Sequence, residues 1–236
     1  MTSCMISQPR YLPALSYLQR IHNCDVFIIL DTVQHSRQDF EHRNRIGDHL
    51  GAKWLSLPLD RSVGSRPSIK QLQLLNEASL QQHCDSILTI YRHADQFNEE
   101  LTRRLYEPLH TLDFVSVLLQ MLQRTFNHLR CGKEGGRRWL RASSLPVNVI
   151  KGPEYLVHLC QHVGASHYVS GPNGKHYIAS EFAEAGLEVS YHQDEPPLYG
   201  RSGHPAIPWL AWIDALHHQG IGYVGDIIRK PMTLCR

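Results

Sequence analysis

The stretch CMISQPRYLPALSYLQRIHNCDVFIILD, residues 4–31, decides the fold of this 236-residue chain. It contains a short apolar run at Cys4–Ser7, a helical pattern at Ala14–His22 and a second apolar run at Val26–Leu30. Two short β-forming runs on either side of a helix are typical of a βαβ unit, in which both strands lie parallel. The stretch therefore predicts an α/β fold with an open sheet.

The same alternation returns further along the chain. We predict more strands at Trp54–Leu57, Trp139–Ala142, His167–Ser170 and Leu187–Tyr191. Between the first two of these, residues at about 80–130 carry apolar side chains at helical spacing. We expect a single domain over residues 1–236, with a mainly parallel, Rossmann-like (nucleotidyltransferase-like) sheet of five or six strands. Helices should cover both faces, with a helical insertion at about 80–130.

Helical patterns also follow the insertion. One opens at Gly152-Pro153 and ends before Gly164, a second runs over Lys175–Ala185, and a third covers Trp209–His218. Glycine after a helix is a common stop, and proline suits the first turn. We expect an irregular loop at 193–208, because prolines and glycines gather there.

Composition excludes several classes of protein. With 42% hydrophobic and 19% charged residues, the chain is typical of globular proteins rather than disordered ones. The formal charge of +2 does not favour nucleic acid as a partner. We find no apolar run of transmembrane length and no signal-peptide pattern, and therefore expect a cytoplasmic protein without a membrane partner.

Neither the cysteines nor the histidines suggest a metal site. The six cysteines form no C-x-x-C pair, and the 16 histidines lack zinc-ligand spacing. We expect reduced, mostly buried thiols, no metal ligands and no cofactor.

Polar side chains stand where the first two predicted strands end. Gln8 and Tyr11 follow one strand, and Asp31 and Gln34 follow the next. The carboxyl ends of parallel strands are the usual ligand site of an open sheet. We therefore predict that Asp31, Tyr11 and Gln8 are catalytic, with Asp31 as the base, and that Gln34 binds substrate. The alternative is a rigid strand-to-helix loop without chemistry.

Two further segments are candidates for substrate binding. Arg43 and Asn44 belong to a basic cluster that suits a phosphate or carboxylate, although a solvated turn or an ion pair with Glu41 is an equal alternative. The turn after His167–Ser170 could form the opposite wall of the cleft, unless it is only a strand-to-helix connection. Its candidate residues are Ser170, Asn173, Lys175 and Tyr177.

Several motifs resemble the WbqC-like protein family over nearly the whole chain. They are QPRYLP (8–13), DVFIILDTVQ (25–34), RNRI (43–46), KWLSLPL (53–59), SGPNGKHY (170–177) and IDAL (213–216). The resemblance implies a biosynthetic transferase, such as a glycine (amino-acid) transferase of surface polysaccharide clusters. Ala14 and Ser16 depart from the family pattern, in which Trp and Gly are common.

The resulting prediction is an enzyme that moves an amino-acid (glycyl) or acyl unit onto a sugar or another small activated acceptor. Its partner would be a small, anionic or phosphorylated substrate. One alternative is a transferase acting on a nucleotide or a nucleic-acid base, which the scarcity of aromatic residues among the basic ones disfavours. Another is a non-catalytic binding protein. Nucleotidyl transfer is disfavoured, because Ala14-Leu15-Ser16-Tyr17 stands where such enzymes carry His-x-x-His.

Overall fold

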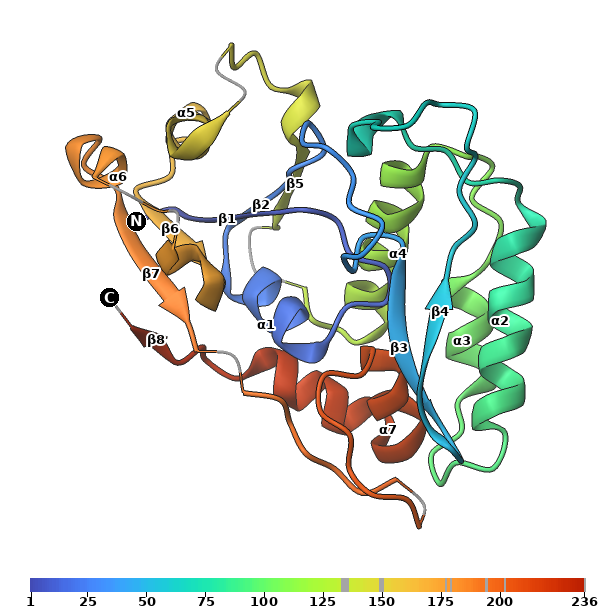
Figure 1. Cartoon of the computed structure of the whole chain (residues 1–236). Coiled ribbons are helices and arrows are strands. Elements are labelled where there is room, and N and C mark those ends of the chain that lie inside the picture. The colour runs from blue at the N-terminus through green and yellow to red at the C-terminus, as the bar shows by residue number, and fades with distance from the viewer. Residues whose placement is uncertain are drawn as a thin grey trace.

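A computed structural model of the chain describes residues 1–132, 136–148, 151–176, 178, 180–193, 195–201 and 203–235. Within them lies a six-stranded sheet in the order β5-β2-β1-β6-β7-β8 (Figure 1). Its strands are β1 (Ser3–Ser7), β2 (Val26–Ile29), β5 (Arg138–Arg141), β6 (His167–Ser170), β7 (Glu188–His192) and β8 (Leu234–Cys235). Only the pairing of β7 with β8 is antiparallel among these strands. The predicted, mainly parallel α/β sheet is confirmed.

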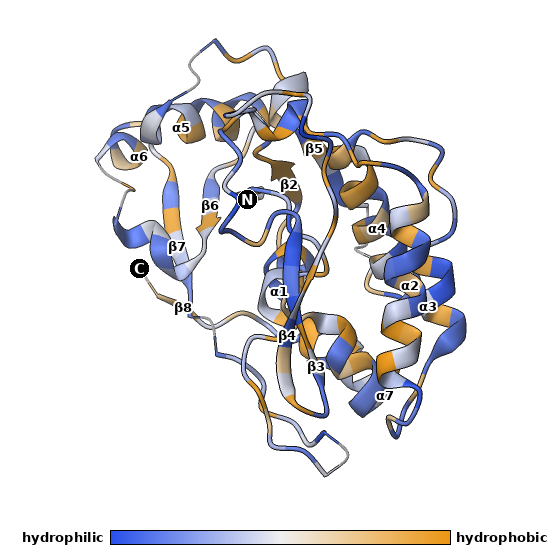
Figure 2. Ribbon diagram, turned by 45° about the vertical axis from the view of Figure 1, so that its right-hand side comes forward, coloured by the Kyte–Doolittle hydropathy of each residue, from blue (hydrophilic) through white to orange (hydrophobic). Residues whose placement is uncertain are grey.

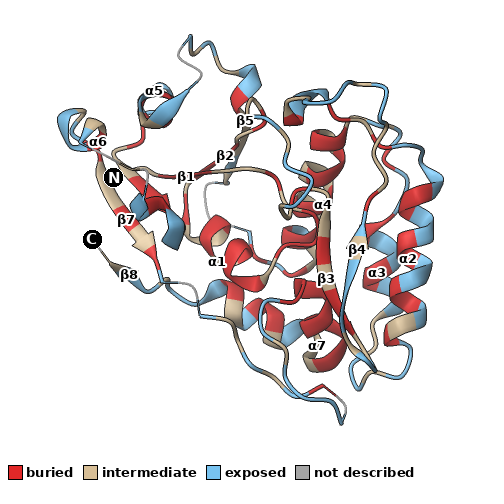
Figure 3. Cartoon of the chain, viewed as in Figure 1, coloured by how far each residue is buried: buried red, intermediate tan, exposed pale blue. Residues whose placement is uncertain are grey.

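Helices cover both faces of the sheet, as predicted. In β1, Met5 belongs to a core that includes side chains of α1 (Leu15–Asn23), α4 (Phe114–His128) and α7 (Trp212–Arg229). Its neighbours Cys4 and Ile6 face a second core with α5 (Gly152–His162) and α6 (Glu181–Glu184). Successive side chains of a strand point to opposite faces, so an apolar run such as β2 becomes buried on both sides. Figures 2 and 3 show β2 as both hydrophobic and buried.

The predicted helical insertion is present between β4 and β5. It comprises α2 (Ala78–Tyr91), α3 (Glu99–Leu105) and α4, preceded by the short 3-10 helix η1 (Ile69–Gln71). Helices α3 and α4 begin at N-cap residues of the preferred type, Asn98 and Asp113. The Asn98 side chain accepts a hydrogen bond from the Leu101 N–H, and the Asp113 side chain accepts one from the Ser116 N–H. The insertion packs beside the sheet and leaves its outer helices α2 and α3 partly exposed (Figure 3).

A β-hairpin outside the main sheet corrects one prediction. The expected strand Trp54–Leu57 lies largely in β4 (Gly51–Ser56), which pairs antiparallel with β3 (Arg43–Asp48), and β3 was not predicted. The pair forms its own two-stranded sheet. Strand β4 pairs with its neighbour β3 instead of joining the parallel sheet, because two antiparallel strands can be connected by a short turn.

Two predicted helices have different bounds. Lys175–Ala185 does not form one helix: the described residues contain the 3-10 helix η3 (Pro172–His176) and, further on, the short α6. Conversely, α7 starts after the predicted Trp209 and continues to Arg229, although its backbone leaves the helical region at Gly220 (φ 86°). No helix in the described part of the chain is both long enough and apolar enough to cross a membrane.

The order of the strands places a crevice between β1 and β6. Strand β1 lies between β2 and β6 in the sheet. The chain passes from β1 to β2 in its first half, whereas β6 belongs to its second half. Ligands of open α/β sheets bind at such a reversal, outside the carboxyl ends of the strands. The segments after Ser7 and Ser170 meet there.

Candidate functional site

A pocket of about 440 Å³ lies at the carboxyl ends of β1 and β6. We call it the switch-point pocket. Its polar lining comes from four segments: the end of β1 with the loop after it, helix α1, the loop after β2 and the turn after β6. These residues include Ser7, Gln8, Arg10, Arg20, Asp39, Ser170 and Asn173. The pocket lining therefore contains two arginines and a single carboxylate.

Arg20 is the unusual member of this set. It sits on α1 and is only 7% exposed, yet its Nε has no hydrogen-bond partner. The guanidinium lies against the backbone of the β6 turn, because a Cβ added to Gly171 would come within 2.5 Å of its Nη1. A buried cationic donor without a partner is costly. Arg20 is therefore available to an anion entering the pocket.

A second unpaired donor lies on the facing strand. Ser170 is 1% exposed, and its Oγ also has no hydrogen-bond partner. The Arg10 guanidinium stacks on Phe40 and Tyr17 at 5.6 and 5.4 Å from the ring centres, so it is held at the rim. A phosphate or carboxylate would satisfy these donors.

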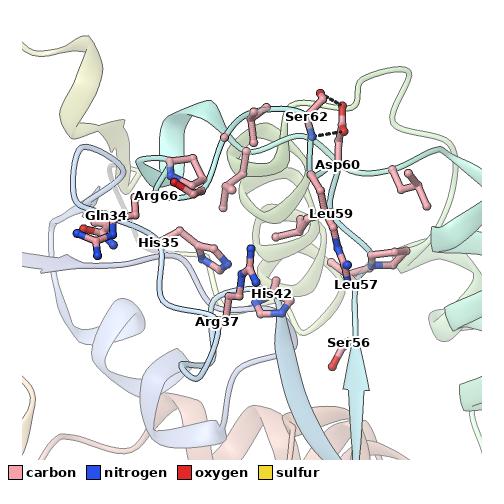
Figure 4. Close-up of a pocket in the computed structure, with 18 residues that line it drawn as sticks. Gln34, His35, Arg37, His42, Ser56, Leu57, Leu59, Asp60, Ser62 and Arg66 are labelled. Carbon is pink, nitrogen blue, oxygen red and sulfur yellow. Dashed lines mark hydrogen bonds between the residues drawn. The ribbon is translucent and has the colours of Figure 1, made fainter.

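A larger cavity of about 890 Å³ lies next along the loop that follows β2 (Figure 4). We call it the histidine cavity. It is enclosed by residues 34–42 on one side and by residues 56–67 on the other, where Ser62 bonds to the Asp60 carboxylate. Three exposed arginines line it, namely Arg37, Arg61 and Arg66.

One residue in the lining of the histidine cavity, His35, is paired with a buried acid. Nδ1 of His35 bonds to the carboxylate of Glu41, which is 1% exposed and also accepts from the Ser36 N–H at 3.0 Å. His42 lies 5.0 Å from His35 between ring centres. Burial, assisted by the neighbouring His35, lowers the pKa of His42 to about 4. A carboxylate on one imidazole nitrogen fixes the ring and leaves the other nitrogen for proton transfer.

The two cavities share one wall. Asp39 lines the switch-point pocket, while Gln34 and Arg37 line the histidine cavity. The loop of residues 32–42 therefore lies between a site with a buried arginine, Arg20, and a site with an oriented histidine, His35.

The predicted base, Asp31, is fully buried, and both of its carboxylate oxygens are occupied. Oδ1 accepts from the Ser143 N–H at 2.9 Å, and Oδ2 accepts from the Ser143 hydroxyl at 2.6 Å and from Arg141 Nε at 2.9 Å. Arg141 also binds Asp113 at 2.6 Å. Asp31 thus joins the end of β2 to the end of β5 and the start of α4.

Tyr11 and the two hairpin residues do not reach either cavity. The hydroxyl of fully buried Tyr11 bonds to His83 Nδ1 at 2.8 Å and to the Tyr106 hydroxyl at 2.5 Å. The Asn44 amide donates to the Leu12 carbonyl at 2.6 Å, and the Arg43 guanidinium stacks 4.3 Å from the ring centre of Trp54.

The predicted residues are therefore not brought into one cleft. Gln8, Ser170 and Asn173 line the switch-point pocket, whereas Gln34 lines the histidine cavity. Lys175 is exposed and lies 5.4 Å from the ring centre of Tyr191. Tyr177 lies outside the described residues.

Sequence reasoning missed Arg20, His35 and Glu41. One signal was available for the first, because Arg20 is the only charged residue within Leu15–Ile21, where every other residue except Gln19 is buried. A charge inside such a stretch either has a partner or binds one. Nothing in the sequence pairs His35 with Glu41.

The buried histidine next to Tyr11 makes stability depend on pH. Burial lowers the pKa of His83 to about 4, below the value of about 6.5 expected in the unfolded chain. The unfolded state therefore binds the proton first, and stability that is complete above about pH 6.5 is lost as the pH falls towards 4. We expect His83→Gln to flatten the slope of unfolding free energy against pH in this window by up to ~1.4 kcal/mol per pH unit.

Urea unfolding at several pH values would measure this slope. The exposed His93, just beyond the same helix, provides the control, because His93→Gln should leave the slope unchanged. An identical slope in His83→Gln and the parent protein would contradict the prediction.

No group of three His, Cys, Asp or Glu side chains could hold a metal ion in the part of the chain that the structure describes.

Comparison with known proteins agrees with the motifs. The model of the WbqC-like protein family matches residues 8–224. The chain is also similar to the uncharacterized protein Rv1507c of Mycobacterium tuberculosis, with 28% identity over 210 residues. That alignment covers 85% of this chain and 88% of the mycobacterial protein. The family match includes every residue that lines the histidine cavity and, apart from Ile6 and Ser7, every residue that lines the switch-point pocket.

Proposed function

Because this chain belongs to the WbqC-like protein family, we propose that it is a biosynthetic transferase with an anionic substrate. It would move an amino-acid (glycyl) or other acyl unit onto a sugar or another small activated acceptor. The observation that carries the proposal is the buried Arg20 in the switch-point pocket, whose Nε lacks a hydrogen-bond partner, beside Ser170, whose hydroxyl also lacks one. Gln8 and Asn173 line the same pocket and would select the bound group.

Two cavities on one loop suit a reaction with two substrates. In acyl transfer, an acceptor amine or hydroxyl attacks the donor carbonyl, the new C–N or C–O bond forms, and the bond to the leaving group breaks. The attacking group loses a proton, which needs a base. His35 is the better base than Asp31, because Glu41 orients its ring, whereas the Asp31 carboxylate is occupied by Ser143 and Arg141. We assign Asp31 and Tyr11 to the support of the fold.

The cysteines support a reducing compartment for this enzyme. None of the six, all within the described residues, forms a disulfide, and five of them are buried. We propose the cytoplasm, where thiols stay reduced.

The test is product formation from an activated glycyl or acetyl donor and a set of nucleotide-activated sugars that carry a free amine. Mass spectrometry should detect an acceptor that has gained one acyl unit. We expect Arg20→Met to raise the KM of the anionic substrate about ten- to hundredfold, because a charge-assisted hydrogen bond is worth ~1.5–3 kcal/mol. His35→Gln should instead lower kcat by at least about a hundredfold.

Arg103→Met is the matched control, because Arg103 is exposed on α3 and pairs with Glu99. It should leave both constants unchanged. Failure of every donor and acceptor pair, or an Arg20→Met enzyme with an unchanged KM, would contradict the proposal. Binding of single-stranded nucleic acid that weakens steeply with salt would favour the nucleic-acid alternative instead.

A further inference from the structure

A third cavity, of about 470 Å³, lies at the other end of the β3–β4 hairpin. It is formed by the hairpin tip, the end of α2, the segment after Gly200 and the first half of α7, and we call it the hairpin-tip pocket. The charged and imidazole side chains that matter are Asp48, Lys53, Arg92, Arg201, His204 and His218. None of its lining residues lines either cavity of the candidate site, so the inference below does not rest on the proposed function.

Arg201 forms the floor of this pocket and is only 2% exposed. Its Nε lies 3.3 Å from the Asp214 carboxylate, and its Nη2 makes a long contact of 3.4 Å with the Asp48 carbonyl. Neither its Nε nor its Nη1 has a hydrogen-bond partner. A buried guanidinium whose Nη1 donates no hydrogen bond needs a further acceptor.

The anionic partner of Arg201 is itself fully engaged. The buried Asp214 accepts from the hydroxyls of Tyr91 and Tyr199, both at 2.8 Å, and from the Gly47 N–H at 3.2 Å. Burial, together with the Asp214 charge, raises the pKa of Tyr91 well above its usual value, so that hydroxyl remains a donor. Asp214 therefore holds Arg201 in place but cannot satisfy its Nη1.

The hairpin backbone fixes the direction of the guanidinium. A Cβ added to Gly47 would lie 1.9 Å from Arg201 Nη2 and 2.6 Å from an Asp214 oxygen, so only glycine allows this approach. The Gly47 backbone packs against one side of the Arg201 fork and Asp214 lies on another, and Arg201 belongs to the lining of the cavity.

We propose that the hairpin-tip pocket binds the phosphate group of a small phosphorylated metabolite. Arg201, Lys53 and Arg92 supply three positive charges in the lining, whereas Asp48 supplies the one carboxylate, paired with Lys53 at 3.6 Å. A phosphate with two negative charges and several acceptor oxygens can bind Arg201 and the rim cations together. A carboxylate has only two oxygens and would leave the rim cations unused.

The direct test is calorimetric titration of the whole chain with inorganic phosphate, performed in the Arg20→Met background so that the switch-point pocket contributes less. Saturable binding is expected at low salt. The double substitution Lys53→Ala and Arg92→Ala, at two exposed positions, should weaken phosphate binding about three- to tenfold without changing the melting temperature. Arg201→Lys should weaken it about ten- to hundredfold, because the fork is lost.

If Arg201→Lys does not fold, the double variant decides the matter. Arg103→Ala, on exposed α3, is the control for a general loss of positive charge and should bind phosphate as the parent does. Three results would overturn the proposal: no phosphate binding in the Arg20→Met background, unchanged binding in the double variant, or acetate binding as tight as phosphate binding. A failure of the Arg20→Met transferase test would leave this titration unaffected.

Discussion

Asp214→Ala is expected to lower the free energy of unfolding by about 3–5 kcal/mol, the usual cost of removing one partner from a buried ion pair. The substitution removes the acceptor of two tyrosine hydroxyls and of the Gly47 N–H. It also leaves Arg201, which is 2% exposed, without its counter-charge. Urea or guanidinium unfolding, followed by circular dichroism, would measure the difference.

The same helix offers a matched control. Asp226 lies further along α7, is exposed and pairs at the surface with Arg229. Asp226→Ala should leave the free energy of unfolding unchanged, because surface pairs contribute little. If Asp214→Ala were as stable as Asp226→Ala, the buried network beneath the hairpin could not be what holds Arg201.

Asp31→Asn is expected to destabilise the protein by about 1–3 kcal/mol, because an amide nitrogen would face donors that now need an acceptor. Those donors are Arg141 Nε, the Ser143 N–H and the Ser143 hydroxyl. If Asp31 is the catalytic base that the sequence predicts, the same substitution is expected to keep the melting temperature and remove most turnover. Thermal unfolding of Asp31→Asn beside Asp85→Asn, at an exposed position on α2, separates the two expectations. An unchanged melting temperature would favour a chemical role for Asp31.

Most of the main sheet could be predicted from the sequence. The runs at β1, β2 and β6 are short, have apolar residues at their centres and are separated by helical patterns, and burial on both faces leaves little freedom in what such runs can form. The insertion of α2 to α4 could also be predicted, because its apolar positions repeat at helical spacing over a long interval.

The β3–β4 hairpin could not be predicted with the same rules. Arg43, Asn44 and Arg45 form a polar run that indicates a turn, and β3 becomes a strand only because it pairs with Gly51–Ser56 and packs Ile46 into the core. Tertiary packing here overrides local propensity.

The site was predicted in part, for a related reason. The position of Gln8, Ser170 and Asn173 at strand ends follows from topology, and these residues do line one pocket. Whether a polar residue at such an end faces a cavity or a buried partner depends on residues far away in sequence. Asp31 accepts hydrogen bonds from Arg141 and Ser143, and the Tyr11 hydroxyl is hydrogen-bonded to His83 and Tyr106. No local sequence pattern predicts these long-range contacts.

The central position of β1 has a consequence for how the chain folds. Its two neighbours are β2, which follows closely, and β6, in which His167 pairs with Ser3. Pairing β6 with β1 closes a long loop that contains the whole chain between these two strands. This closure costs chain entropy before the contacts between the strands can form, and parallel pairing of this kind therefore slows folding. Before β6 pairs with β1, one edge of β1 exposes N–H and C=O groups without strand partners, next to side chains that are buried in the native state. Such an intermediate can add a strand from another copy, so refolding yield should fall as protein concentration rises.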